Sequence, residues 1–143
     1  MNGSKVAIIG AGGVGATIAY AALINGVGRE IAFYDIDADK VQAEVLDLNH
    51  GLRFTPTARV IGSDHLDICA DADIIVITAG AKQRPGETRM DLAGRNTDIF
   101  RDLVPALVER APEAVLLVVT NPVDVLTYVA LQLSGWPPSR VIG

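Results

Sequence analysis

The segment from Lys5 to Asp35 constrains the fold of this 143-residue chain more than any other stretch. An apolar run at residues 6–9 leads into the sequence GAGGVG at residues 10–15, and small residues follow from Ala16. A second apolar run then ends on Asp35. Short apolar runs bounded by glycines are typical of buried strands, and the small-residue segment between them is long enough for a helix. The segment therefore predicts a strand, a glycine-rich turn, a helix and a second strand.

The three glycines of this G-x-G-x-x-G pattern each have a physical role. Gly10 permits a tight turn, Gly12 lets the backbone approach a pyrophosphate, and Gly15 removes a side chain where helix and strand pack closely. The positive end of the helix would face the phosphates, and Asp35 could accept hydrogen bonds from an adenosine ribose. A turn that only packs is the weaker alternative, because the motif follows a strand and opens a helix. The segment thus predicts a dinucleotide-binding site.

Composition restricts the classes of protein to which the chain can belong. Half of the residues are hydrophobic and 20% are charged, which is typical of a globular chain. The net charge of −5 argues against a nucleic-acid or anionic-membrane partner, and no apolar run approaches the roughly 20 residues that span a bilayer. Cys69 is the only cysteine, which excludes an internal disulfide and a cysteine-based metal cluster. We expect one domain over residues 1–143, in the reducing cytoplasm and without a metal site.

Further along the chain, periodicity and turn residues predict alternating strands and helices. Strands are expected at residues 58–61, 74–78, 114–119 and 140–143, and helices at residues 38–48, 91–110 and 123–133. This order gives two βαβαβ halves, and hence an α/β fold with a doubly wound parallel sheet, the Rossmann fold, in three αβα layers. The ligand crevice should lie at the carboxyl ends of the first and fourth strands.

Several local features predict where the helices and loops begin and end. Asp37 should cap the second helix, and Pro105 should kink or split the third. Asn121 should cap the fourth helix, with Pro122 as its first residue. Residues 83–88 contain a Pro-Gly pair and predict a mobile loop.

The assembled motifs resemble the N-terminal, NAD-binding half of the L-lactate/malate dehydrogenase family, and the bacterial lactate type in particular. The resemblance covers residues 5–143 and rests on six motifs: IGAGGVG at 9–15, YD at 34–35, TAG at 78–80, QRPGETR at 83–89, Leu92 with Asn96, and TNPVD at 120–124. It implies NAD as the cofactor. The residues that it implies for cofactor binding are Gly10, Gly12, Gly13, Val14, Gly15, Asp35, Thr78, Ala79, Gly80, Asn96 and Asn121.

The resemblance also implies a mobile active-site lid with a catalytic arginine. Residues 80–89 are similar to the family's lid, and Arg89 matches the arginine that polarises the keto oxygen during hydride transfer. Asn121 matches a catalytic asparagine near the nicotinamide and the substrate. Without the resemblance, Arg89 would be interpreted as a solvated loop charge. The flanking PGET sequence and the downstream asparagine favour the catalytic role.

Gln83 matches the position that faces the substrate side chain. Malate enzymes of this family carry arginine here, because a second carboxylate favours a bidentate guanidinium. A neutral glutamine suits the methyl group of pyruvate, beside which an unpaired arginine would be a desolvated charge. Gln83 therefore favours lactate, with malate as the rival and a polar loop residue without a role as the other alternative. Asp35 is followed by Ile36 and not by arginine, which favours NAD over NADP.

The family's acid/base histidine, its partner aspartate and the substrate-carboxylate arginine belong to the half that would follow Gly143. His50 and His65 lie in the wrong elements to replace that histidine and, like Cys69 and Trp136, are expected to be structural. Because the chain stops on an apolar strand, we expect a fragment that lacks the C-terminal catalytic domain and binds NAD(H) without turnover. A non-catalytic NAD-binding module is the alternative, against which the intact lid argues. Family membership further implies a small 2-oxo or 2-hydroxy acid substrate and a homodimer or homotetramer.

Overall fold

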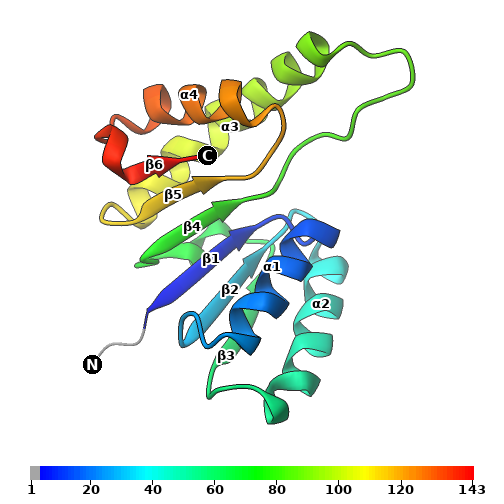
Figure 1. Cartoon of the computed structure of the whole chain (residues 1–143), viewed down its shortest axis with the longest axis vertical. Helices are drawn as coiled ribbons and strands as arrows, with labels where there is room; N and C mark the ends of the chain where they lie inside the picture. The colour runs from blue at the N-terminus through cyan, green and yellow to red at the C-terminus, as the bar shows by residue number, and fades with distance from the viewer. Residues whose placement is uncertain (1–3) are drawn as a thin grey trace.

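The computed structural model describes residues 4–143, within which six strands and four α-helices alternate (Figure 1). The strands are β1 Lys5–Ile9, β2 Glu30–Tyr34, β3 Arg59–Ser63, β4 Ile74–Ile77, β5 Val115–Val118 and β6 Val141–Ile142. The helices are α1 Gly13–Ile24, α2 Ala38–Gly51, α3 Arg89–Arg110 and α4 Val123–Ser134, with short 3-10 turns at Leu52–Phe54, Leu66–Cys69 and Pro138–Arg140. None of the helices described in this range is long and apolar enough to cross a membrane.

The six strands form one parallel sheet in the order β3-β2-β1-β4-β5-β6. The order reverses between β1 and β4, so the chain leaves these neighbouring strands in opposite directions. Their last residues, Ile9 and Ile77, are paired, which brings the loops that follow both strands to the same point of the sheet edge. The doubly wound topology and the crevice position predicted from the sequence are confirmed.

Successive side chains along a strand point to opposite faces of the sheet, so the hydrophobic core is divided between the two faces. On β1, Val6 and Ile8 join the buried cluster beneath α1 and α2, whereas Ala7 and Ile9 join the cluster beneath α3 and α4. Strands that are apolar on both faces must be covered on both, because helices pack there in a parallel α/β sheet. The two pairs of helices can be followed over the two halves of the sheet in Figure 1. The predicted three-layer arrangement is confirmed.

The α3 helix is continuous through Pro105, so the prediction that this proline splits the helix is wrong. Pro105 is on the exposed side of α3, while Val104 and Leu107 on either side of it are fully buried. Proline removes one backbone hydrogen bond, and burial of the neighbouring side chains on the sheet offsets that loss. Tertiary packing therefore overrides the local preference.

The end of β3 and the N-cap of α4 differ from those predicted, whereas the N-cap of α2 agrees with the prediction. The strand expected at residues 58–61 extends to Ser63 and includes Gly62. A Cβ atom on Gly62 would lie 2.5 Å from Val45 Cγ2, so the glycine lets α2 pack on the strand. Pro122, not Asn121, occupies the N-cap position of α4, and no side chain caps that helix. The expected cap at Asp37 is confirmed, since its carboxylate accepts a hydrogen bond from the Lys40 N–H at 3.1 Å.

The buried phenylalanine of α3 provides a test of this packing. Replacing Phe100, which is fully buried, with alanine should lower the free energy of unfolding by about 3–5 kcal/mol, because it leaves a cavity in the core. Replacing Phe54, which is 89% exposed, with alanine should change it by less than about 0.5 kcal/mol. Urea denaturation followed by circular dichroism measures both. Equal losses in the two variants would contradict the described core.

Candidate functional site

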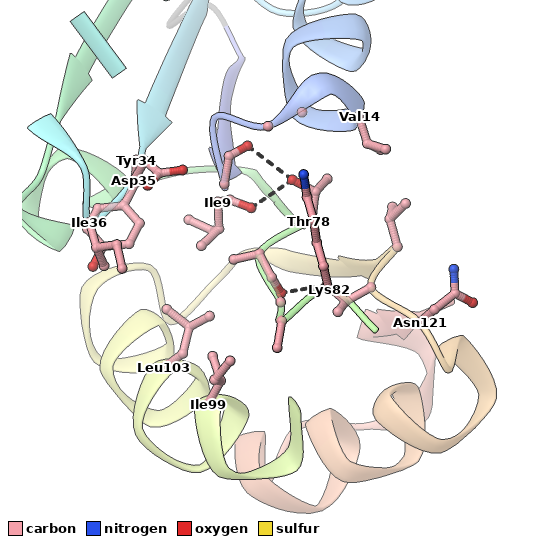
Figure 2. Close-up of a pocket in the computed structure, with 18 of the residues that line it drawn as sticks. Ile9, Val14, Tyr34, Asp35, Ile36, Thr78, Lys82, Ile99, Leu103 and Asn121 are labelled. Atoms are coloured by element: carbon pink, nitrogen blue, oxygen red, sulfur yellow. Dashed lines mark hydrogen bonds between the residues drawn. The ribbon is translucent and has the colours of Figure 1, made fainter. Parts of the chain in front are cut away.

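A cleft of about 1050 Å³ opens at the carboxyl ends of β1 and β4 (Figure 2). The turn after β1, the end of β2, the turn after β4, the inner face of α3 and the end of β5 all contribute to its walls. Eleven of the residues predicted for the site line this cleft: Gly10, Gly12, Gly13, Val14, Gly15, Asp35, Thr78, Ala79, Gly80, Gln83 and Asn121. The volume is in the upper range for small-molecule sites. The sequence-predicted turn and the predicted crevice therefore coincide.

The glycines of the turn divide into two that the fold needs and two that face open space. Gly10 has φ +106°, and a Cβ atom there would lie 2.8 Å from the Ala79 nitrogen. A Cβ atom on Gly15 would lie 2.0 Å from the Gly10 carbonyl oxygen. At Gly12 and Gly13, an added Cβ would meet no protein atom within 4 Å. The tight turn and the close packing predicted for Gly10 and Gly15 are confirmed, and the space at Gly12 is open.

The N-terminus of α1 provides an anion-binding surface in the cleft. Gly12 is its N-cap, no side chain makes a capping hydrogen bond, and the first turn contains no acidic residue. The first N–H groups of a helix have no partner within the helix, and the helix dipole adds positive potential at this end. Glycines before and within the first turn keep side chains away from these groups. A phosphate could therefore reach the backbone directly.

Asp35 is held firmly at the end of β2. Its Oδ2 accepts a hydrogen bond from the Ala11 N–H at 2.7 Å, and its Oδ1 accepts one from the Asp37 N–H at 3.0 Å. These contacts leave further lone pairs on the carboxylate for hydroxyl donors. Lys40 Nζ lies 3.8 Å from Oδ2 and also lines the cleft. Lys40 is not predicted by the sequence motif, which concerns only the residue directly after Asp35. Since α2 begins at Ala38, its first turn brings Lys40 back over the strand end.

Two threonines join the strand ends that form the floor of the cleft. The Thr78 hydroxyl lies 3.0 Å from the Ile9 carbonyl oxygen and 3.1 Å from that of Gly10, and it donates to this pair (Figure 2). The Thr120 hydroxyl lies 3.1 Å from the Ile77 carbonyl oxygen and 2.8 Å from that of Ala79. These bonds join the turns after β1, β4 and β5 to one another at the floor of the cleft.

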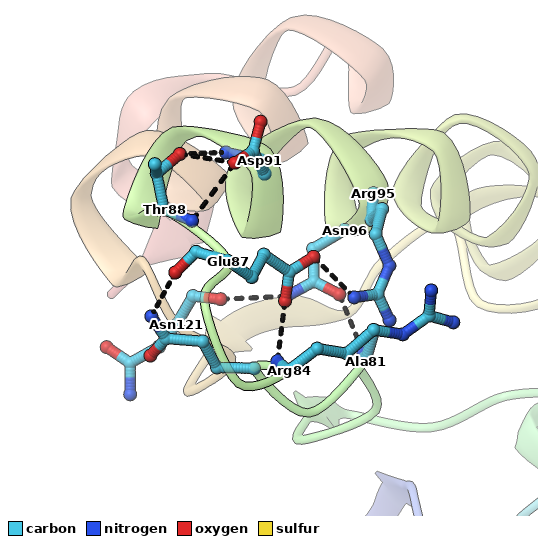
Figure 3. Close-up of polar contacts among 9 residues, drawn as sticks. Ala81, Arg84, Glu87, Thr88, Asp91, Arg95, Asn96 and Asn121 are labelled. Carbon is cyan, nitrogen blue, oxygen red and sulfur yellow. Dashed lines mark hydrogen bonds and ion pairs between the residues drawn. The ribbon is translucent and has the colours of Figure 1, made fainter.

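Asn96 does not line the cleft, although cofactor binding is expected of it from the resemblance. It lies in α3 and is 1% exposed, which leaves no surface for a ligand. Its Oδ1 accepts a hydrogen bond from the Ala81 N–H at 2.7 Å, and its Nδ2 donates to the Asn121 carbonyl at 2.8 Å (Figure 3). The amide is therefore committed to the backbone behind the cleft. The prediction that Asn96 contacts the cofactor directly is therefore corrected: its side chain contacts the backbone of two loops that line the cleft.

The loop between β4 and α3 extends away from the sheet (Figure 1). As a result, the two predicted lid residues, Gln83 and Arg89, lie in different places relative to the cleft. Gln83 lines the cleft, but its side-chain amide donates to the Glu87 carbonyl at 2.9 Å. Arg89 is exposed and lies outside the cleft lining, because Thr88 and Asp91 form a capping box that makes Arg89 the first residue of α3. The structure brings Gln83 and Asn121 to the cleft and leaves Arg89 at its margin.

The end of this loop is anchored to α3 through Glu87. Its Oε2 accepts a hydrogen bond from the Arg84 N–H at 2.7 Å, and its Oε1 forms an ion pair with the Arg95 guanidinium (Figure 3). The backbone N–H of Arg84 and, next, the Arg95 guanidinium hold the pKa of Glu87 below its usual value. The loop therefore has a defined, charge-dependent attachment.

The four residues that were expected to be structural lie outside the cleft. His50 and His65 are exposed, and neither lines it. Cys69 is buried beneath α3, where burial raises the pKa of its thiol to about 11 and keeps it protonated. Trp136 lies under the Arg140 guanidinium, 4.1 Å from the ring centre. Among residues 4–143, no group of three His, Cys, Asp or Glu side chains is placed to hold a metal ion.

The Glu87 anchor predicts a measurable titration. Since the folded state lowers the pKa of Glu87, the stabilisation is present above the unfolded pKa and is lost as the pH falls through the folded value. In an Arg95→Gln variant, the Glu87 midpoint should rise while remaining below its unfolded value, because the Arg84 N–H still donates. Carboxyl ¹³C NMR measures this midpoint. Arg101→Gln, which removes an exposed pair with Asp98, is the control and should not move it. An unchanged midpoint in Arg95→Gln would disprove the anchor.

Comparison with known proteins identifies the family to which these features belong. The model of the lactate/malate dehydrogenase NAD-binding domain matches residues 4–143. An L-lactate dehydrogenase of Bifidobacterium animalis subsp. lactis is 51% identical over 98% of this chain and 44% of its own length. L-lactate dehydrogenase B of Hordeum vulgare is 50% identical over 98% of this chain and 41% of its own length.

Solved structures give the same result. The minor L-lactate dehydrogenase of Enterococcus mundtii superimposes with a TM-score of 0.92 at 38% identity, over 99% of this chain and 45% of that one. A lactate dehydrogenase from a Medee basin deep-sea metagenome library superimposes with a TM-score of 0.90 at 44% identity and the same coverage. The chain thus spans less than half the length of these relatives. Because the family model covers every described residue and the cleft lies where the fold places a dinucleotide, the chain belongs to the lactate/malate dehydrogenase family, as its NAD-binding domain.

Proposed function

We propose that this chain binds NAD(H) in the cleft and presents it for hydride transfer between NADH and pyruvate in an L-lactate dehydrogenase. The observation that carries the proposal is the uncapped, glycine-bordered N-terminus of α1, which opens on the cleft between Asp35 and Asn121. We further propose that residues 1–143 form the cofactor domain and that a separate domain supplies the substrate-binding half. The relatives, which are more than twice as long, support this division.

The cleft offers a different chemistry at each end, which supports a definite direction for the dinucleotide. Asp35 and Asn121 lie at opposite ends in Figure 2. The Asp35 end, bordered by Ile36, Ile99 and Leu103, combines a hydrogen-bonding carboxylate with apolar walls suited to adenosine. The turn between the two ends would hold the pyrophosphate. The nicotinamide, which supplies or accepts the hydride, would then lie at the Asn121 end.

The negative charge at Asp35 favours NAD over NADP. A 2′-phosphate on the adenosine ribose would lie beside this carboxylate and be repelled. Lys40, whose Nζ lies 3.8 Å from Asp35 Oδ2, offsets part of this charge and could itself contact the cofactor. Because Lys40 is paired with Asp35, it does not offer a 2′-phosphate a free cation.

The lid would complete the site on closure. Arg89 begins α3 directly after the extended loop, so inward movement of the part of this loop that follows Ala81 would bring its guanidinium over the cleft. There it would stabilise negative charge developing on the keto oxygen, an effect of about 3 kcal/mol for one donor in a water-free site. Asn121 would orient the substrate and nicotinamide. In the described part of the chain no histidine lines the cleft, so the proton donor, worth about 10²–10⁴ in rate, must come from elsewhere.

Gln83 supports lactate over malate, which is the second candidate substrate. It is a neutral side chain at the cleft margin, and it suits a methyl group better than a carboxylate. We also propose a homodimeric or homotetrameric complete enzyme in the cytoplasm, which the resemblance to the family supports. A non-catalytic NAD-binding module is the less favoured alternative, because the loop that ends on Arg89 has no role in binding alone.

Binding of NADH by this chain tests the proposal, with Gly12→Ala as the diagnostic variant. The added methyl would project into the space assigned to the pyrophosphate and should weaken NADH binding at least about tenfold, the equivalent of 1.4 kcal/mol. Gly94→Ala, an exposed change in α3 where a Cβ also meets nothing, should leave binding unchanged. NADH fluorescence measures the affinity. No NADH binding by the native chain, or equal binding by Gly12→Ala, would refute the site.

Substrate choice is tested in a complete enzyme that carries this domain. Gln83→Arg should shift kcat/KM from pyruvate towards oxaloacetate by at least about tenfold, because the guanidinium pairs with the second carboxylate. Lys82→Arg, at the neighbouring cleft residue, is the control for an added guanidinium near the site. NADH oxidation followed at 340 nm with both substrates gives the ratio. An unchanged ratio in Gln83→Arg would remove the argument for lactate. The isolated chain should oxidise no NADH with either substrate.

A further inference from the structure

We infer that Asn96 is a positioning residue that sets the nicotinamide half of the cleft by holding the backbone of two cleft loops together. The inference deepens the proposed function and rests on it, because the cleft must bind a dinucleotide for its halves to have distinct ligands. Asn96 touches no ligand in this account. It acts through Ala81, on the loop after β4, and Asn121, on the loop after β5.

Both polar atoms of the Asn96 side chain bond to backbone groups. It is 1% exposed, with its oxygen accepting from the Ala81 N–H at 2.7 Å and its nitrogen donating to the Asn121 carbonyl at 2.8 Å (Figure 3). One buried side chain thus satisfies a donor from one loop and an acceptor from the other. Only an amide combines both functions at this length, since a carboxylate only accepts and an aliphatic side chain does neither.

The bridge lies where the sheet no longer holds the loops. Hydrogen bonds of the β4–β5 ladder continue as far as the Thr120 N–H, which donates to the Ile77 carbonyl. Past that residue, the segments that begin with Ala81 and Asn121 are joined through Asn96. The packing is tight, because a Cβ atom on Gly80 would lie 2.4 Å from Thr120 Cγ2 and 3.2 Å from Asn96 Oδ1. Asn96 therefore has little freedom to release either loop.

Together with its neighbour Arg95, Asn96 attaches both ends of the loop between β4 and α3, here called the lid base (Ala81 and Glu87), to α3. Arg95 holds Glu87 near the end of the loop, while Asn96 holds Ala81 near its beginning. The same turn of α3 therefore fixes both ends of the segment that must move when the lid closes. The adenosine half is built differently, from α1, β2 and the carboxylate of Asp35, which is held by the Ala11 and Asp37 N–H groups. Loss of Asn96 should accordingly disturb one half of the site and spare the other.

The test compares a ligand that fills the whole cleft with one that fills only the adenosine half. Dissociation constants for NADH and for ADP are measured by calorimetry on the native chain and on Asn96→Asp and Asn96→Leu. Both variants should weaken NADH about 10- to 100-fold, as expected when buried polar groups lose a partner, and should change ADP affinity less than about twofold. Asn49→Asp is the matched control, because Asn49 Nδ2 also bonds to backbone carbonyls, those of Val45 and Val60, away from the cleft.

Each outcome bears on a separate claim. A selective loss of NADH affinity supports the positioning role. Unchanged NADH affinity, or an equal loss for NADH and ADP, overturns it. Failure of the native chain to bind either ligand would instead refute the proposed function.

A measurement on the native chain covers the case in which the Asn96 variants do not fold. Amide hydrogen exchange should be slow at Ala81, should slow further with NADH, and should be unaffected by ADP. Equal protection of Ala81 by both ligands, or by neither, would overturn the inference.

Discussion

The close contact between Gly15 and the carbonyl of Gly10 is the constraint on which the site depends. With no room for a Cβ atom at either residue, α1 starts almost on top of the ends of β1 and β4, and the Thr78 hydroxyl ties these ends together. That contact aims the first N–H groups of α1 into the space opened by the reversal of strand order. A cleft with a positive helix end at its centre follows from steric exclusion at two backbone positions.

The two ends of the cleft are stabilised by different means. At the Asp35 end, a carboxylate is fixed by two backbone N–H groups and balanced by Lys40. At the other end, buried side chains of Thr120 and Asn96 hold carbonyl and N–H groups of the loops. The first end offers the ligand a charged carboxylate, whereas the second end offers it backbone groups of loops whose positions are set by buried hydrogen bonds. A dinucleotide with chemically distinct halves suits such a cleft, and the lid base lies at the second end, where hydride transfer would occur.

The sequence predicted the fold because each prediction depended on local chemistry. Glycines at 10 and 15 have roles that follow from sterics alone, and continuous apolar strands require helices on both faces. The misplaced features depend on tertiary contacts. Pro105 remains within α3 because the helix is buried around it. Asn121 does not cap α4 because the helix begins at Val123 and places Pro122 at the N-cap position.

The candidate site residues were also misplaced where their positions depend on tertiary contacts. The motif predicts that Asn96 binds the cofactor, but it does not show that the amide faces backbone groups and not the cleft. Lys40 becomes part of the site only because α2 starts close to the end of β2. The position of Arg89 depends on a capping box at Thr88 and Asp91, a pattern that the sequence carries and that fixes the start of α3 two residues before the predicted one.

A crystal structure of this chain with bound NADH would test the proposed cofactor site. We expect the pyrophosphate at hydrogen-bonding distance from the N–H groups of residues 12–15, the adenosine ribose on Asp35 and the nicotinamide beside Asn121. A dinucleotide bound elsewhere on the molecule, or bound in this cleft in the reverse direction, would contradict it.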